Sequence, residues 1–209
     1  MRRTLFLPLL AAAAVLAAGC DQPATAPAGT LDARESAALA AGLDEVTGAA
    51  LGGGLAAFGG FDLAPGGARP SAAPVPVNVP VERTQPCPKG GSVAVSGTLK
   101  GEVDPAARSA TLETVATTTH AACAFPGKAG GATLTVTGSP NLALRATVKA
   151  VNGVPSGPQV ATQKGAFTWS ASDGRSGSCS VDVTSTFDPA AMKRTVAGTV
   201  CGVAVDVTK

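Results

Sequence analysis

His120 is the only histidine in the chain of 209 residues, so any mechanism that needs an imidazole would have to use it. A Ser-His-Asp or Cys-His arrangement would need it as the base. Because Cys123 follows three residues later, the two side chains could also supply half of a zinc site. Two further ligands would be required, and a disulfide at Cys123 would remove one of the pair. We therefore expect His120 to be a solvated strand residue, and we predict no catalytic residue, metal or cofactor.

Carboxylates are the second group that could do chemistry, since a pair of them can hydrolyse glycosidic bonds. Asp104, Asp173 and Asp188 stand next to Pro or Gly, which is typical of aspartates that initiate turns. Asp182 and Asp206 alternate with valines and are expected to face water. We therefore predict that the chain is not an enzyme, with a carboxylate-dependent hydrolase as a remote alternative. The candidate acids are Glu102, Asp104, Glu113, Asp173, Asp182, Asp188 and Asp206.

Trp169 is the only tryptophan, and a polar, Gly-rich loop follows it. Trp169, Asp173 and Arg175 could form the rim of a binding site there. The alternative interpretation is structural: Phe167 and Trp169 would fill a small core, and the glycines would form a hairpin. The sequence leaves both interpretations open.

Charge and composition exclude nucleic acid as a partner. Lys and Arg number 16 and Asp and Glu 14, and removal of an N-terminal segment containing Arg2 and Arg3 would leave 14 of each sign. Such a chain lacks the basic surface that binds phosphates. Aromatic residues make up only 3% of the chain, so few rings are present on which bases could stack.

The N-terminus has the features of an export signal. Arg2 and Arg3 precede a 14-residue uncharged run that ends at Ala18, which is shorter than the roughly 20 residues of a membrane-spanning helix. The run ends in Leu16-Ala17-Ala18-Gly19-Cys20, and this ending resembles the lipobox of bacterial lipoproteins. The resemblance implies that residues 1–19 are a signal peptide and that Cys20 becomes the acylated first residue of the mature chain.

The same resemblance implies a location. Several acyl chains on Cys20 would exceed what stable anchoring needs, so we expect the protein on the exported side of a bacterial cell-envelope membrane. Asp21 resembles a signal for inner-membrane retention in enteric bacteria, but the leaflet stays open. A plain secretory signal, with an incidental cysteine, is the alternative.

The composition between Cys20 and Cys87 predicts three segments. Residues 20–30 are Pro/Ala-rich and predict a flexible tether. Residues 31–61 predict a helical segment, with Thr30 as its N-cap and glycines 52–54 ending the regular helix; a disordered tether throughout is the alternative. Residues 62–86 predict a Pro/Gly-rich linker, within which residues 73–81 suit polyproline or an edge strand. The apolar positions at helical spacing are Leu39, Leu43, Val46 and Ala50.

Residues 87–209 alternate apolar and polar side chains, which predicts an all-β domain of about seven antiparallel strands in meander order. Turn signals separate the runs. The apolar positions are Val93, Val95, Leu99, Val103, Leu134, Val136, Leu142, Leu144, Ala146, Val148, Phe167, Trp169, Ala171, Val181, Val183, Phe187, Val203, Val205 and Val207.

Four cysteines in this domain predict two disulfides, as expected for an exported protein. The string Asp-Pro-Ala-Ala lies midway between Cys87 and Cys123 and again midway between Cys179 and Cys201. Since opposed residues of a hairpin have a constant sum of numbers, each pair could face across its own ladder. We favour Cys87–Cys123 and Cys179–Cys201. The opposite parity of two apolar residues, Leu112 and Val115, predicts a bulge in the first hairpin.

A sheet with one apolar face must cover it. It could close into a barrel, fold into a sandwich, or receive the helix across a curved surface. We favour a barrel or half-barrel with the helix at its open side. The predicted function is a lipid-anchored envelope lipoprotein with a non-enzymatic binding or structural domain. Its partners would be the membrane and an envelope protein, and the alternative is a carrier of a hydrophobic or lipid ligand.

Overall fold

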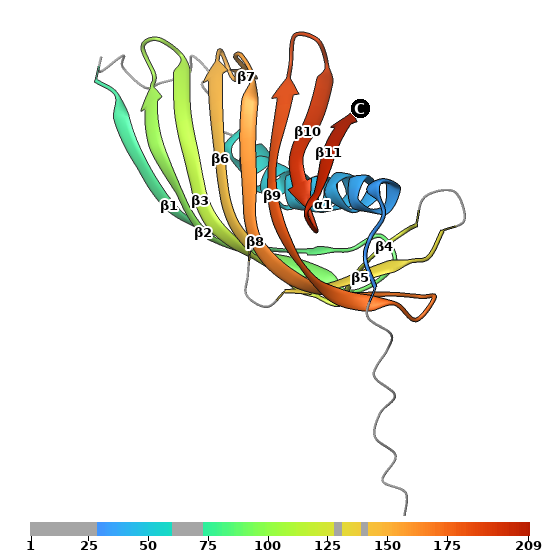
Figure 1. Ribbon diagram of the computed structural model, residues 1–209. Helices are drawn as coiled ribbons and strands as arrows, with labels where there is room; N and C mark the ends of the chain where they lie inside the picture. The colour runs from blue at the N-terminus through green and yellow to red at the C-terminus, as the bar shows by residue number, and fades with distance from the viewer. Residues whose placement is uncertain (1–28, 60–72, 128–130, 139–141) are drawn as a thin grey trace, which may run out of the picture.

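The computed structural model describes residues 29–59, 73–127, 131–138 and 142–209, the side chains of residues 53–59 excepted. One antiparallel sheet and one helix form the body (Figure 1). The predicted signal peptide, Cys20, most of the tether and the first part of the linker lie outside the described residues. The elements are α1 Ala33–Gly59, β1 Val75–Pro86, β2 Ser92–Asp104, β3 Ser109–Ala121, β4 Cys123–Phe125, β5 Leu134–Gly138, β6 Leu142–Val151, β7 Val154–Pro155, β8 Gln159–Ala171, β9 Ser176–Asp188, β10 Lys193–Val200 and β11 Val203–Thr208.

The predicted all-β, antiparallel fold is confirmed. Eight strands follow one another in the order β1-β2-β3-β6-β8-β9-β10-β11, which is the predicted meander. The described sheet has eleven strands where about seven were predicted; beside this path, β4 pairs with β5, β5 with β8, and β7 with β6. The described part of the sheet is open, with β1 and β11 at its two edges, and it is strongly curved (Figure 1).

Glycines at close strand contacts accompany this curvature. A Cβ atom on Gly198 would lie 2.1 Å from the carbonyl oxygen of Asp182, and one on Gly97 would lie 2.3 Å from that of Val115. Both glycines belong to one cross-strand row, and glycine in a strand interior often marks a tight bend. The row runs through Val81, Gly97, Ala116, Leu144, Gln163, Val183, Gly198 and Val205.

The sheet begins earlier than the sequence analysis predicted. Residues 75–86, assigned to a linker, form strand β1, which pairs with β2 along its whole length. The alternative of an edge strand for this Pro-rich run is therefore the correct one. Pro76 and Pro80 are tolerated because an edge strand leaves one side of its backbone unpaired.

Helix α1 lies along the concave face and contacts the strands at both edges, β1 and β2 on one side and β10 and β11 on the other (Figure 1). Its predicted apolar positions are all buried: Leu39, Leu43, Val46 and Ala50 are at most 4% exposed. The concave face and these residues form the core together with the buried Phe167 and Trp169, whose structural interpretation is confirmed. The predicted picture of a curved sheet with the helix at its open side therefore holds.

Both predicted ends of α1 are wrong. The N-cap is Asp32 and not Thr30: its carboxylate accepts the N–H groups of Arg34 and Glu35 at 2.7 and 2.8 Å. The Glu35 carboxylate accepts the Asp32 N–H at 3.0 Å, which completes a capping box. At the other end the helix continues past Gly52 to Gly59. Glycine lowers helix propensity by only about 1 kcal/mol, so a helix can continue where its surroundings support it.

The helix glycines provide a matched stability prediction. A Cβ at exposed Gly52 has nothing within 4 Å, whereas one at Gly42 would lie 2.5 Å from Cδ1 of Phe125. We expect Gly52→Ala to raise the free energy of unfolding by about 0.5–1 kcal/mol, because alanine loses less backbone entropy. Gly42→Ala should lower it by about 1–2 kcal/mol through overpacking against buried Phe125. Urea denaturation of both variants measures this, and equal effects would contradict the packing described.

Both predicted disulfides are present, Cys87–Cys123 and Cys179–Cys201, with Cα–Cα distances of 5.4 and 4.6 Å. Their predicted position across the ladders is not confirmed. Cys87 precedes β2 and Cys123 begins β4, while Cys201 lies in the turn after β10. The ladders are shifted from the predicted centres, since β2 and β3 pair Asp104 with Ser109.

The bulge predicted in β3 is absent, because β2 and β3 pair without interruption. Leu112 points inward and is buried, whereas Val115 points outward and is exposed. The two residues lie on opposite faces, as their parity requires in a regular strand.

Candidate functional site

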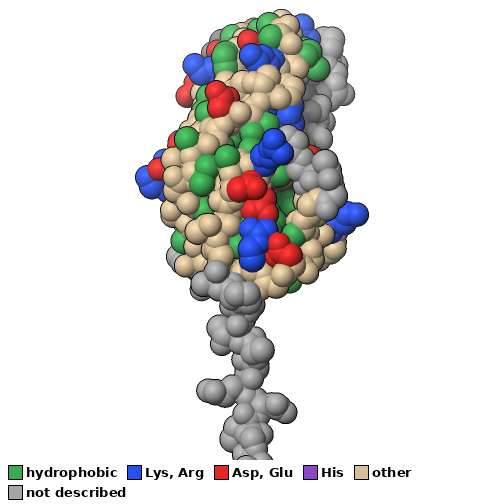
Figure 2. Space-filling model, turned by 45° about the vertical axis from the view of Figure 1, so that its right-hand side comes forward, with side chains coloured by type: hydrophobic (Ala, Val, Ile, Leu, Met, Phe, Trp, Pro, Cys, Tyr) green, Lys and Arg blue, Asp and Glu red, His purple; other side chains and the backbone are tan. Residues whose placement is uncertain are grey.

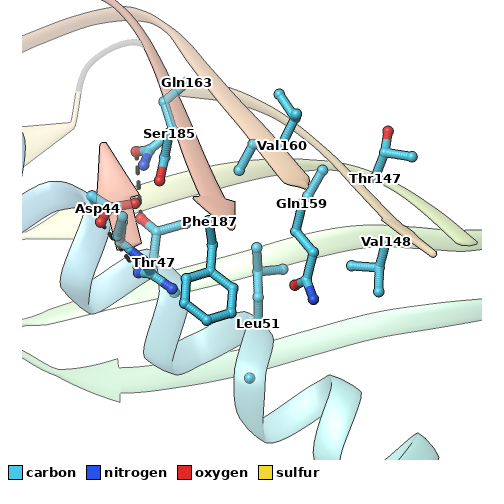
Figure 3. Close-up of a pocket in the computed structure, with 15 residues that line it drawn as sticks. Asp44, Thr47, Leu51, Thr147, Val148, Gln159, Val160, Gln163, Ser185 and Phe187 are labelled. Atoms are coloured by element: carbon cyan, nitrogen blue, oxygen red, sulfur yellow. Dashed lines mark hydrogen bonds and ion pairs between the residues drawn. The ribbon is translucent and has the colours of Figure 1, made fainter. Parts of the chain in front are cut away.

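A hollow between the second half of α1 and the concave face of the sheet is the candidate functional site (Figure 3). Its volume is about 150 Å³. The helix provides one wall, and strands β6, β8, β9 and β10 provide the others. Its lining residues are Asp44, Thr47, Gly48, Leu51, Gly52, Ala146, Thr147, Val148, Gln159, Val160, Ala161, Gln163, Ser185, Phe187 and Arg194.

Small side chains create this space. Ala146 pairs with Ala161 and Ala161 with Ser185, so three small residues lie side by side across three strands. Gly48 and Gly52 of α1 also line the hollow.

The hollow has hydrogen-bonding side chains at its inner end. Gln163 is 3% exposed, and its carboxamide oxygen accepts the Thr47 hydroxyl at 3.4 Å (Figure 3). Ser185, 8% exposed, lies on the neighbouring strand. Among the described residues, nothing accepts a hydrogen bond from the Gln163 amide group. Gln163 and Ser185 both line the hollow, so their polar atoms can receive a hydrogen-bonding group of a molecule from outside.

An ion pair borders the same space. Nη1 of Arg194 lies 3.2 Å from Oδ2 of Asp44, a helix residue whose side chain is only 6% exposed. The guanidinium group also lies over the Phe187 ring, 5.7 Å from its centre, at cation–π distance. The pair joins the helix to β10 and neutralises the buried carboxylate.

Arg194 and Lys164 allow a matched test of this ion pair. We expect Arg194→Met to lower the free energy of unfolding by about 2 kcal/mol, because Asp44 would keep a buried charge without a partner. Lys164→Met removes the cation of an exposed pair, in which both side chains are more than half exposed. It should change stability by less than about 0.5 kcal/mol. Similar losses in guanidinium denaturation would show that the Asp44 carboxylate does not depend on Arg194.

Two further ion pairs hold the helix, each with the acid on α1 and the base on the sheet side. Arg175 donates to Glu35 at 3.1 Å and to Asp173 at 2.8 Å. Hydrogen bonds from Arg175 lower the pKa of Glu35 and Asp173 below their ordinary values. Lys209 lies 3.4 Å from Glu45. Figure 2 shows acidic and basic side chains next to one another down the face that it presents.

The three residues predicted as a possible binding rim therefore have other contacts. Trp169 is a core residue, 4% exposed. Asp173 and Arg175 form the ion-pair group at the start of α1, where Arg175 also donates to the carbonyl oxygen of Thr30 at 3.1 Å. These side chains are occupied in holding the helix against the β8–β9 turn.

His120 is buried and not solvated as predicted. It points inward from β3 and is 1% exposed. Within the described part of the chain, neither ring nitrogen has a hydrogen-bond partner. Burial lowers its pKa to about 4, so the ring is neutral at pH 7. The even-numbered residues of β3 from Leu112 onward point inward, and His120 is one of them. Val115 is apolar but exposed, and its odd number suggested the opposite face.

Most of the candidate acids have structural contacts. Asp104, Asp173 and Asp188 accept backbone N–H groups within their turns, as predicted. Glu113 and Asp182 pair with Arg145 and Lys164 on the outer face. Over the ranges that the structure describes, no group of three His, Cys, Asp or Glu side chains could hold a metal ion.

No pattern in the sequence was taken to indicate Asp44, Gln163 or Arg194 as site residues. A signal for Gln163 exists: it has the parity of Phe167 and Trp169, so extending that alternation toward the N-terminus places it on the inner face. Asp44 carried no such signal, because helix α1 buries it by contact with a strand 150 residues away.

No helix in the described ranges is long and apolar enough to cross a membrane. Searches of protein-family models, curated proteins and solved structures give no significant match to this chain.

Proposed function

We propose that this protein is a lipoprotein of the bacterial cell envelope, anchored by acyl chains on Cys20, whose β domain has a non-enzymatic binding or structural role. Its partners are the membrane and an envelope component.

The cysteine arrangement carries the proposal. The chain has five cysteines, and the four in the β domain are joined to one another in two disulfides. None of the four is left to pair with Cys20, the odd cysteine of an exported chain. A thiol directly after Leu16-Ala17-Ala18-Gly19 suits acylation.

The position of Gly29 supports a body held close to the bilayer. Its N–H donates to the carbonyl oxygen of Ser176 at 3.0 Å, so the chain is attached to the body at the β8–β9 turn. Nine residue steps separate Cys20 from Gly29, and they span at most about 30 Å. The β8–β9 turn would therefore lie within about 30 Å of the anchor.

The filled concave face favours this role over a lipid carrier. Binding sites for drug-sized ligands usually measure about 300–1,000 Å³, whereas the hollow beside α1 measures about 150 Å³. To carry a long acyl chain, the protein would have to move α1 away from the concave face of the sheet. Three ion pairs, at Glu35, Asp44 and Glu45, oppose that movement.

Metabolic labelling with an alkyne analogue of palmitate in a bacterial host tests the proposal. The unchanged chain should incorporate label and sediment with membranes. Cys20→Ser should lose at least about 90% of the label, because the acylated thiol is absent. The double variant Cys179→Ala/Cys201→Ala is the matched control and should keep its label. An unlabelled native chain, or a labelled Cys20→Ser variant, would contradict the proposal.

A further inference from the structure

We infer that the hollow between α1 and strands β6, β8, β9 and β10 binds a small neutral molecule with one hydrogen-bonding group and a compact apolar body. This inference does not depend on the lipid anchor, because it rests on the described residues of the body alone.

The size of the hollow limits the ligand. An apolar cavity of about 150 Å³ accepts a benzene-sized ring, and the hollow has about this volume. A ligand of about nine non-hydrogen atoms, such as a ring with one polar substituent, matches it, whereas a long acyl chain does not.

Gln163 supplies the first argument for a polar group on the ligand. Its neighbours along the cross-strand row are Leu144 and Val183, both at most 2% exposed, so an amide at this place interrupts an apolar surface. The carboxamide has two N–H donors, and among the described residues it makes one hydrogen bond, which it accepts from Thr47. Gln163 lines the hollow and is 97% buried, and within the part of the chain that the structure describes its N–H groups have no acceptor, so a ligand acceptor can take that place.

Ser185 adds a hydroxyl to the same end of the hollow. It follows Val183 by two residues on β9, so both side chains lie on the inner face. A hydroxyl can donate or accept. A carboxamide or alcohol group between Gln163 and Ser185 could therefore make hydrogen bonds to both.

The charges around the hollow indicate a neutral ligand. Asp44 and Arg194 form a pair with no net charge. An anion would compete with Asp44 for the guanidinium group, and a cation would compete with Arg194 for the carboxylate. Breaking an ion pair whose carboxylate is buried is costly, so neither charged form is favoured.

Apolar side chains complete the site. Leu51 on the helix, Phe187 on β9 and Val148 on β6 line the hollow away from Gln163 (Figure 3). An aromatic ring can pack against Phe187 in offset or edge-to-face geometry. The ligand would therefore place its polar group inward, toward Gln163, and its ring toward Leu51 and Phe187.

Benzamide is the probe that tests this inference, with benzoate and benzylammonium as charged probes of the same size. The full chain, isolated with or without an acyl anchor and carrying labelled Leu and Val methyl groups, is titrated by methyl NMR up to about 10 mM, which covers millimolar dissociation constants. Benzamide should shift the Leu51 and Val148 methyl signals saturably and leave Leu134 unmoved. The charged probes should bind at least tenfold more weakly.

Two variants localise the binding. Gln163→Leu should weaken benzamide at least tenfold, and Ala161→Leu, which fills the hollow, should abolish the shifts. Should Ala161→Leu fail to fold, Gln163→Leu decides, because leucine already occupies this row at Leu144. The inference is wrong if benzamide gives no saturable shift, if all three probes act equally, or if Gln163→Leu binds benzamide as the unchanged chain does.

Discussion

Acidification should destabilise this protein by about 3 kcal/mol between pH 7 and pH 4 through His120 alone. The folded-state pKa is about 4, whereas an unfolded histidine has a pKa near 6.5. Between these pH values the unfolded chain binds a proton at His120 and the folded chain does not. The contribution of His120 to the free energy of unfolding is therefore fully present above pH 6.5 and is lost progressively as the pH falls toward 4. Each unit of difference contributes about 1.4 kcal/mol.

His120→Leu isolates this effect, because the variant keeps every carboxylate of the chain. The low pKa values of Glu35 and Asp173 also reduce stability in acid, but they do so equally in both proteins. Urea denaturation at several pH values should show that the free energy of unfolding falls more steeply below pH 6.5 for the native chain than for His120→Leu. Parallel curves from pH 7 to pH 4 would mean that His120 titrates normally and is not buried.

Removal of either disulfide should lower the free energy of unfolding by about 3–4 kcal/mol in the chain-entropy model. The bridges close segments with separations of 36 residues for Cys87–Cys123 and 22 for Cys179–Cys201. Without a bridge the unfolded chain gains freedom, and the loss is only slightly larger for the longer segment. The double variants Cys87→Ala/Cys123→Ala and Cys179→Ala/Cys201→Ala measure each contribution.

A reductant provides the control for these variants. Dithiothreitol should lower the stability of the native chain to that of a variant without the four cysteines, and should not affect that variant. If a double variant unfolds at the same denaturant concentration as the oxidised native chain, the corresponding bridge contributes nothing to folding.

Local patterns predicted the sheet and the buried side of the helix. Strands alternate with period two, so Val93, Leu142 and Phe167 could be assigned to the inner face from neighbouring residues alone. The spacing of Leu39 and Leu43 likewise assigned both residues to the buried side of the helix. The cysteine pairing depended on turn positions, and it survived a shift of the ladders because the bridges lie at the strand ends.

Contacts between distant segments could not be predicted. Arg194 meets Asp44 across 150 residues, and Thr47 meets Gln163 across 116. Nothing local shows that a helix with several acidic residues will lie in a concave sheet. The prediction for His120 was wrong for a different reason: Val115 is apolar but exposed, so it suggested that the odd-numbered residues of β3 point inward.

The candidate site could not be predicted from the sequence for the same reason. Gly48, Ala146 and Ala161 look unremarkable in sequence, and their small size matters only because the helix and sheet place them together. The proposed anchor is the opposite case, since the prediction for Cys20 rests on its immediate neighbours and needs no tertiary contact.

Mass spectrometry of the N-terminal tryptic peptide tests the central claim of membrane anchoring most directly. Trypsin cleaves after Arg34, so the mature protein should yield residues 20–34. That peptide should begin at Cys20 and carry a diacylglyceryl group on its sulfur. A peptide that begins elsewhere, or one that begins at Cys20 with an unmodified thiol, would contradict the account and leave an exported protein without an anchor.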